Sequence, residues 1–199
     1  MRGITARKQR GPSTVADVLA MPEAERRHEV IDGEIVQKEA ATGEHGAAQI
    51  NIATSLNGPF GRRPPGGPPD RPGGWWFATE VEIRFGEHLL RPDVAGWRRE
   101  RVAERPRGCP VEALPDWTCE ILSTNRVNDL VRKKRIYHEH RVPHYWIADP
   151  AEGTLAVQRW SADGYVEVVS AVRGERVRAE PFDALELPVG VFFGDDDGG

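Results

Sequence analysis

The 199-residue sequence contains only two cysteines and no long hydrophobic run. Two thiols in a chain of this length, Cys109 and Cys119, are better explained as reduced residues of a cytosolic protein than as a disulfide. Nowhere do about 18 apolar residues follow one another, and the basic residues 1–20 lack the apolar centre of a signal peptide. These absences argue against a secreted disulfide-rich domain and against membrane-spanning helices, and they predict a cytoplasmic protein.

An excess of positive charge is also missing, because 27 lysines and arginines stand against 31 acidic residues. Proteins that coat nucleic acid without sequence preference usually carry a basic footprint over the whole domain, so this class is disfavoured. Two basic stretches remain, at residues 84–107 and 132–135. Each is either a nucleic-acid contact or a solvated charged face, and the sequence leaves both interpretations open.

The length and the 39% hydrophobic content predict one domain with a substantial core. We expect a flexible leader over residues 1–12, a single domain over residues 13–194 and an acidic flexible tail over residues 195–199. The Pro- and Gly-rich residues 58–74 are predicted to form a long loop, since proline removes backbone donors and glycine offers no side chain to pack.

Hydrophobic periodicity predicts the element order of a mixed α/β sheet. A short helix is expected after Ser13 or Thr14, and further helices over residues 44–56 and 125–140. Strands are expected over residues 75–85, 89–97, 117–122 and 142–150. The dipeptides Asp32-Gly33 and Asp163-Gly164, each between apolar alternating runs, predict one hairpin near each end of the domain.

Two acids, Asp93 and Glu120, stand within or beside apolar strands. Burial of a carboxylate costs several kcal/mol unless the group is paired or binds a cation, so these acids are the first candidates for a site. The stretch between them allows one strand to leave, loop over and return beside its neighbour. Two convergent carboxylates, with a backbone carbonyl and waters, are the oxygen ligands that Mg²⁺ or Mn²⁺ prefers.

A lysine on the following helix would complete a site for phosphodiester hydrolysis. Its ammonium could orient the attacking water, stabilise developing charge, or act as a base if burial lowers its pKa. Both Lys133 and Lys134 are candidates, and the apolar stripe of this helix is centred nearer Lys134. The residues of that stripe are Val127, Leu130, Val131 and Tyr137. Helix geometry alone does not choose between the two lysines.

Four blocks occur in order between residues 28 and 150: HEVIDGEIV, RPDVAGW, PDWTCEILS and DLVRKKRIYHEHRVPHYWIADP. Together with a histidine at the start of the first core helix, they resemble the Uma2 family of restriction endonucleases. The resemblance implies a restriction-endonuclease-like PD-(D/E)XK core, which is a mixed β-sheet flanked by helices, here with added N- and C-terminal β-hairpins. It also implies an endonuclease that hydrolyses DNA with Mg²⁺ or Mn²⁺.

In the family pattern the lysine lies on the helix after the third strand, four residues after an aspartate and four before a tyrosine. Asp129, Lys133 and Tyr137 match this spacing, so the resemblance selects Lys133. Leucine at position 122 stands where the usual third-strand lysine would be. By the same comparison, His45 matches the family histidine, near the metal or the phosphate.

The expected site therefore has Asp93, Glu120 and the backbone carbonyl of Ile121 as metal ligands. Lys133 would position or activate the water, and His45 and Tyr137 would support the site. DNA is the expected partner, and a homodimer is expected because nucleases that cut both strands often work as two-fold dimers.

Ordinary roles remain open for each of these residues. Asp93 could cap a turn, Glu120 could pair with an arginine of residues 98–107, and Lys133 could be a solvated helix residue. At the level of function, the protein could keep the nuclease fold yet only bind nucleic acid or a protein partner. Glycoside hydrolysis by paired carboxylates is less well supported, because it leaves Lys133 without a role.

Overall fold

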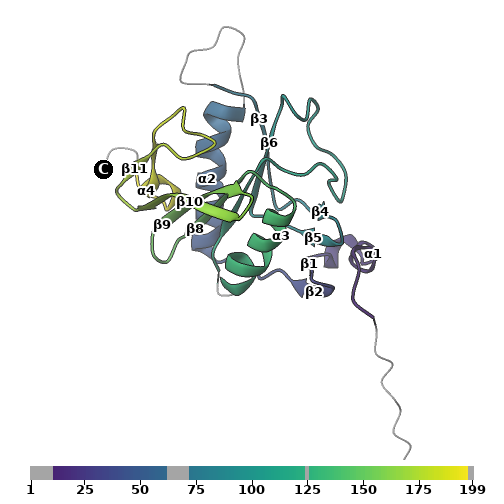
Figure 1. The fold of residues 1–199 in the computed structure, drawn as a ribbon. Coiled ribbons are helices and arrows are strands. Elements are labelled where there is room, and N and C mark those ends of the chain that lie inside the picture. The colour runs from purple at the N-terminus through teal and green to yellow at the C-terminus, as the bar shows by residue number, and fades with distance from the viewer. Residues whose placement is uncertain (1–10, 62–71, 124–125, 197–199) are drawn as a thin grey trace, which may run out of the picture.

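A six-stranded mixed sheet forms the centre of the protein in this computed structural model, which describes residues 11–61, 72–123 and 126–196 (Figure 1). The strand order is β10-β9-β8-β7-β6-β3, and only the β7–β8 pair is parallel. The strands are β3 (Trp75–Thr79), β6 (Val94–Arg98), β7 (Trp117–Ile121), β8 (His144–Asp149), β9 (Thr154–Ser161) and β10 (Gly164–Val172). The predicted mixed α/β class is confirmed.

The parallel pair needs a crossover, which a helical segment between β7 and β8 provides. This segment consists of a π-helical stretch, η2 (Asn128–Lys133), followed directly by α3 (Lys134–Glu139). The predicted helix therefore exists, although its expected first residue, 125, lies outside the described residues.

The apolar stripe predicted for this helix is wrong at two of its four residues, since Leu130 and Tyr137 pack in the core but Val127 and Val131 do not. Val127 and Val131 are 63% and 58% exposed, whereas Asp129 and Lys133 are buried. A π-helix bonds residue i to residue i+5, so the face that points inward changes relative to an ordinary α-helix. The uniform rotation per residue assumed in the sequence analysis does not apply to such a stretch.

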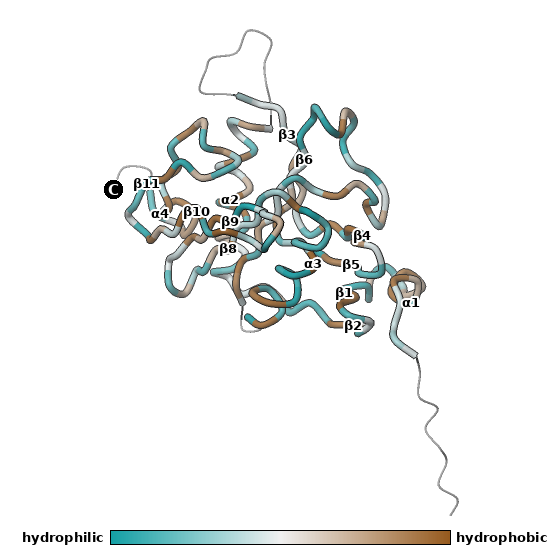
Figure 2. The backbone as a smooth tube through the Cα atoms, in the orientation of Figure 1, coloured by the Kyte–Doolittle hydropathy of each residue, from teal (hydrophilic) through white to brown (hydrophobic). Residues whose placement is uncertain are grey.

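A second, four-stranded sheet lies beside the first, with strand order β2-β1-β5-β4. Its strands are β1 (His28–Ile31), β2 (Glu34–Gln37), β4 (Ile83–Phe85) and β5 (His88–Leu90). The predicted N-terminal hairpin is confirmed, and both turn residues, Asp32 and Gly33, have positive φ angles of 54° and 75°. The predicted short helix, α1 (Val15–Leu19), is capped by Thr14 and lies beside this sheet as a largely hydrophobic turn (Figure 2).

Two predicted strands are each divided between the two sheets. The expected strand over residues 75–85 breaks at Glu80, where a φ of 56° sends the chain from β3 to β4. The expected strand over residues 89–97 breaks at residues 91–93, between β5 and β6. Alternation of apolar residues continues across the first break, so the pattern does not reveal it, and apolar residues flank the second break on both sides. Both breaks lie at the junction of the sheets.

The first core helix, α2 (Gly43–Gly61), covers one face of the six-stranded sheet and is longer than predicted. Its apolar side packs on the sheet through Ala48, Ile52, Leu56 and Phe60. The expected loop over residues 58–74 is wrong at its start, because the helix continues through Pro59. A proline this close to the helix end removes one hydrogen bond without interrupting a following turn. Residues 62–71 lie outside the described part of the chain.

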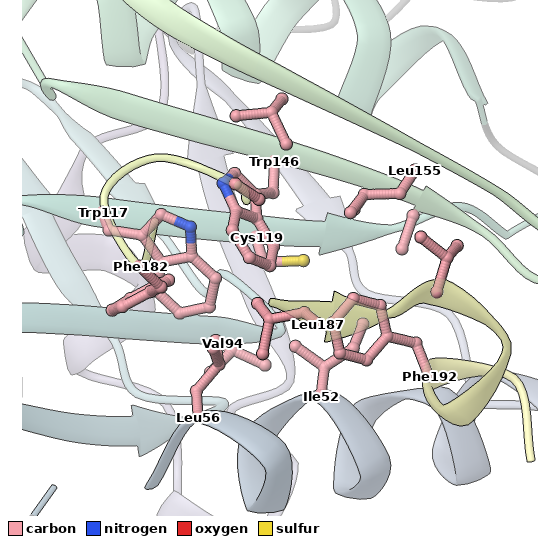
Figure 3. Packing of buried hydrophobic residues seen from close by; sticks show 14 of the residues in the cluster. Ile52, Leu56, Val94, Trp117, Cys119, Trp146, Leu155, Phe182, Leu187 and Phe192 are labelled. Atoms are coloured by element: carbon pink, nitrogen blue, oxygen red, sulfur yellow. The ribbon is translucent and has the colours of Figure 1, made fainter. Parts of the chain in front are cut away.

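The predicted C-terminal hairpin is confirmed as β9 and β10, and the segment after it, for which no element was predicted, contributes to the core. After β10 come β11 (Arg176–Val177), β12 (Leu187–Pro188) and α4 (Val189–Phe192). Figure 3 shows Phe182, Leu187 and Phe192 from this segment packed against side chains of α2 and the sheet. These residues are five positions apart, a spacing that matches neither the helix period nor the strand period, so the sequence pattern does not mark them. No described helix is long and apolar enough to cross a membrane.

Candidate active site

Asp93, Glu120 and Lys133 come together at one pocket, and all three side chains are buried. β6 and β7 are antiparallel with Val94 opposite Cys119, so Asp93, just before β6, lies beside Glu120 of β7. The backbone N–H of Ile121 donates to Asp93 Oδ2 at 2.7 Å, which ties the two strands together at this point. The order of residues predicted from the sequence is therefore also a spatial cluster.

Glu120 points away from α2 and toward the crossover helix. Its Oε1 accepts a 2.5 Å hydrogen bond from the Tyr137 hydroxyl, and its Oε2 lies 3.2 Å from Lys133 Nζ. Since both faces of β7 are covered, this carboxylate is 1% exposed. Tyr137 thus contacts the site directly, as the sequence analysis expected of a supporting residue.

Lys133 contacts three carboxylates. Besides Glu120, its Nζ lies 3.1 Å from Asp129 Oδ1 and 3.3 Å from Glu29 Oε1. The carboxylate of Glu29 also accepts the Arg91 backbone N–H at 2.7 Å. Glu29 was not predicted as a site residue, although it is an acid inside an apolar strand, the same criterion that identified Asp93 and Glu120.

Asp93 has two basic neighbours. His45 Nε2, in the first turn of α2, lies 3.3 Å from Asp93 Oδ2, and Lys38 Nζ lies 2.8 Å from Asp93 Oδ1. The expected proximity of His45 to the site is thus observed. Lys38 was missed because it follows β2 in a polar stretch, where no hydrophobic pattern marks it as buried.

The pKa directions separate the two acids. Burial alone raises the pKa of Asp93, but the hydrogen bond from His45 and the ammonium of Lys38 outweigh it and hold this pKa below its ordinary value. Burial also raises the pKa of Glu120, and here the neighbouring Lys133 does not reverse the effect. The pocket thus stabilises the ionised form of Asp93 more strongly than that of Glu120.

The pKa of Lys133 is raised well above its ordinary value, because attraction to Glu120, Glu29 and Asp129 exceeds the opposing effect of burial. Lys133 is therefore an ammonium ion here, and the sequence-based alternative of a neutral base is disfavoured. The pKa of His45 is also raised, chiefly by its hydrogen bond to Asp93.

The pocket has the charge balance of a cation site. Five acids line it, Glu29, Glu39, Asp93, Glu120 and Asp129, against two lysines, Lys38 and Lys133. Within the described ranges, no group of three or more His, Cys, Asp or Glu side chains forms a ready metal cage. Magnesium is commonly held by one or two carboxylates together with waters, so Asp93 and Glu120 fit such an ion.

The ordinary roles considered for these residues do not match the structure. Asp93 accepts from Ile121 on a neighbouring strand and caps no local turn. Glu120 pairs with Lys133 and Tyr137, not with an arginine. Lys133 is 3% exposed and is therefore not solvated.

The basic stretches contribute mainly intramolecular contacts. Arg99 and Arg105 stack over the Trp76 ring at 3.6 and 4.9 Å, and Arg101 pairs with Asp116. In the second stretch, Arg132 and Arg135 pair with Asp32. These arginines stabilise loops and the N-terminal hairpin. Their contacts within the protein match neither a nucleic-acid contact nor a solvated charged face.

Comparison with known proteins agrees with this architecture. A solved structure of "a putative nuclease belonging to DUF820" from Anabaena variabilis ATCC 29413 has a TM-score of 0.69 at 24% identity, over 92% of this chain and 98% of that chain. At this identity the likeness shows the fold alone. A search of curated proteins found no match. The Uma2 family, described as "Putative restriction endonuclease", matches residues 15–190, and the chain therefore belongs to this family.

Proposed function

We propose that the protein is a Mg²⁺- or Mn²⁺-dependent endonuclease that hydrolyses phosphodiester bonds in DNA. The observation that carries the proposal is the buried pair of Asp93 and Glu120 on adjacent strands, with the Lys133 ammonium 3.2 Å from Glu120. Membership of the Uma2 family supports nuclease chemistry at this pair.

In this proposal Asp93, Glu120 and the backbone carbonyl of Ile121 would hold the metal ion. When bound, the ion would stabilise negative charge on the phosphoryl oxygens and lower the pKa of a bound water. The Ile121 N–H donates to Asp93 Oδ2 and so fixes one prospective ligand, while the Tyr137 hydroxyl fixes the other through Glu120 Oε1. Both carboxylates would be oriented before an ion arrives.

Lys133 would act as a positive charge. Its raised pKa favours the protonated form, in which it would donate hydrogen bonds to the attacking water or to a phosphoryl oxygen. His45 would hold Asp93 in place through its Nε2, which lies 3.3 Å from Asp93 Oδ2.

The proposed DNA contact surface includes the cavity next to the pocket. This cavity of about 290 Å³ is lined by Arg27 and Arg91 and shares Lys38 and His45 with the pocket. Cationic groups beside the carboxylates would attract the phosphodiester backbone. A homodimer remains part of the proposal for cutting both strands, and light scattering on the purified protein measures it.

A cleavage assay on supercoiled plasmid with Mn²⁺ tests the proposal. Asp93→Asn and Glu120→Gln should each reduce cleavage by at least about 100-fold, because each removes a charged ligand. Glu112→Gln, at an exposed acid that pairs with Arg84 and does not line the pocket, is the matched control and should cut like the wild type. Circular dichroism checks that all variants fold. Full activity of either site variant would contradict the assignment.

A second candidate function is binding without cleavage. It is favoured by one observation, namely that both carboxylates already contact lysines, Lys38 at Asp93 and Lys133 at Glu120. Calorimetric titration with Mn²⁺ separates the two functions. No binding, or binding that is unchanged in Glu120→Gln, would favour the second candidate.

A further inference from the structure

The ammonium group of Lys38 is surrounded by three oxygen atoms at hydrogen-bond distance. Its Nζ lies 2.8 Å from Glu80 Oε1, 2.8 Å from Asp93 Oδ1 and 2.7 Å from the backbone carbonyl of Arg91. An ammonium has three donors, so all of them are used. Two carboxylates and one carbonyl are also the oxygen donors that a divalent cation prefers.

The fold builds this oxygen set at the junction of the two sheets. The positive φ of Glu80 ends β3 and turns the chain, and the Arg91 guanidinium donates to the Glu80 carbonyl at 3.2 and 3.3 Å. Gln49 of α2 donates to Glu80 Oε1 at 3.1 Å and to the Asp93 carbonyl at 2.9 Å. These contacts hold Glu80 and Asp93 in place independently of Lys38.

Lys38 reaches the oxygen set from a separate element. Its backbone N–H donates to the Arg27 carbonyl at 2.9 Å, which prolongs the hairpin by one residue and directs the side chain to the junction. The side chain is 16% exposed and lines both the pocket and the adjoining cavity. The flexible Lys38 side chain thus places its ammonium at a partly accessible site.

We propose that Lys38 fills a second cation position, next to the one between Asp93 and Glu120, so that the protein binds one divalent ion in place of two. This inference rests on the proposed function for the first position. Metal-dependent phosphodiesterases with two ions place them about 3.5–4 Å apart on a shared carboxylate. Here the shared carboxylate is Asp93, which gives Oδ1 to Lys38 and keeps Oδ2 on the side of Ile121 and His45.

A purely structural ion pair would behave differently. If Lys38 only stabilises the sheet junction, its removal lowers the stability of the protein and leaves the number of bound ions unchanged. If it fills a cation position, its removal leaves Glu80, Asp93 and a carbonyl free to bind an ion. Counting bound ions therefore separates the two roles.

The experiment counts bound Mn²⁺ by the loss of the free-ion signal in electron paramagnetic resonance at saturating metal. We expect one equivalent in the wild type and two in Lys38→Ala. The double variant Lys38→Ala/Glu80→Gln should return to one equivalent, because the second position loses a ligand. Lys134→Ala removes a lysine outside the oxygen set and should bind one equivalent.

Each other result decides the matter. One equivalent in both the wild type and Lys38→Ala, or two in the wild type, would overturn the inference and leave the proposed function standing. No binding in either protein would overturn both. A further possible result is that the wild type binds no ion, Lys38→Ala binds one, and the double variant binds none. This result would support the inference and contradict the proposed function. Lys38→Ala could fail to fold without metal. In that case, refolding of Lys38→Ala by Mn²⁺, without refolding of the double variant, supports the inference. Failure of Mn²⁺ to refold Lys38→Ala contradicts it.

Discussion

Lys133 lies among Glu29, Glu120 and Asp129, and this environment explains why a lysine is tolerated where 3% of its surface is exposed. A buried charge is costly unless partners compensate it. The neighbouring Lys134 is only half-buried and lacks such a set of partners in the described structure. The two lysines, which helix geometry in the sequence could not separate, are thus distinguished by the carboxylates around them.

Replacing each lysine by methionine tests this difference. Lys133→Met should reduce Mn²⁺-dependent cleavage by about 100-fold or more, because it removes the only cation in contact with Glu120 among the described residues. Lys134→Met should stay within about twofold of the wild type. Single-turnover plasmid cleavage measures both, with thermal unfolding as the check on folding. Equal activities of the two variants would refute the role of Lys133.

Removal of the Tyr137 hydroxyl tests whether metal binding depends on the hydrogen bond that orients Glu120. Tyr137→Phe leaves a buried carboxylate oxygen without its donor, which should lower the free energy of unfolding by about 1–3 kcal/mol and weaken Mn²⁺ binding by about tenfold. Tyr165→Phe is the control, since its hydroxyl also makes a hydrogen bond, to the Val142 carbonyl. It should cost stability without changing Mn²⁺ affinity. Equal affinities in both variants would contradict the positioning role.

At the scale of elements, the sequence predicted the helices and strands that have a simple hydrophobic pattern or a clear turn or cap signal. β7, the two hairpins and the capped α1 are such cases. The breaks at Glu80 and at residues 91–93 were missed, because apolar residues on both sides of each break suit either sheet and only tertiary pairing decides. The π-helical stretch η2 was also missed, since the sequence pattern assumes the rotation of an ordinary α-helix. Glu80 reaches the site through the first of these breaks, whereas Lys38 reaches it from the residue that follows β2.

The C-terminal segment after β10 should be essential to the core. Phe182 contacts five aromatic rings at centroid distances of 4.9 to 5.7 Å: Phe60, Trp75, Phe77, Trp117 and Trp146. Phe182→Ala should therefore lower the free energy of unfolding by about 3–5 kcal/mol in urea titrations. The exposed neighbour change Asp183→Ala should cost less than about 0.5 kcal/mol. A cost below about 1 kcal/mol for Phe182→Ala would mean that this segment does not pack as described.

His144 at the start of β8 should make the protein sensitive to acid. Burial, with the nearby charges of Arg98 and Arg159, lowers the pKa of His144 to about 4. Between about pH 6.5 and pH 4 the unfolded chain holds a proton that the folded chain lacks, so stability falls as the pH falls through this window. Between pH 7 and pH 5 the loss from this residue should be at most about 2 kcal/mol.

The matched variant His144→Gln isolates this contribution from that of the carboxylates. Urea unfolding at pH 7 and pH 5 should show a smaller loss of stability in the variant than in the wild type. An equal loss in both proteins would exclude His144 as the cause.

At the scale of the whole molecule, the site lies where the six-stranded and four-stranded sheets meet. The six-stranded sheet and its crossover helix supply Glu120, Lys133 and Tyr137, and the N-terminal hairpin supplies Glu29 and Lys38. Neither unit alone contains the full set of charges. This arrangement gathers five acids and two lysines in one pocket, although the net charge of the protein is only −4.

The most direct test of the central claim is a crystal structure of the protein soaked in Mn²⁺, with the ion located by its anomalous signal. The proposed function predicts a peak within about 2.5 Å of an oxygen of both Asp93 and Glu120, with Lys133 facing it. An anomalous map without a peak at these two carboxylates, from crystals in saturating Mn²⁺, would contradict the claim that they form a metal-dependent nuclease site.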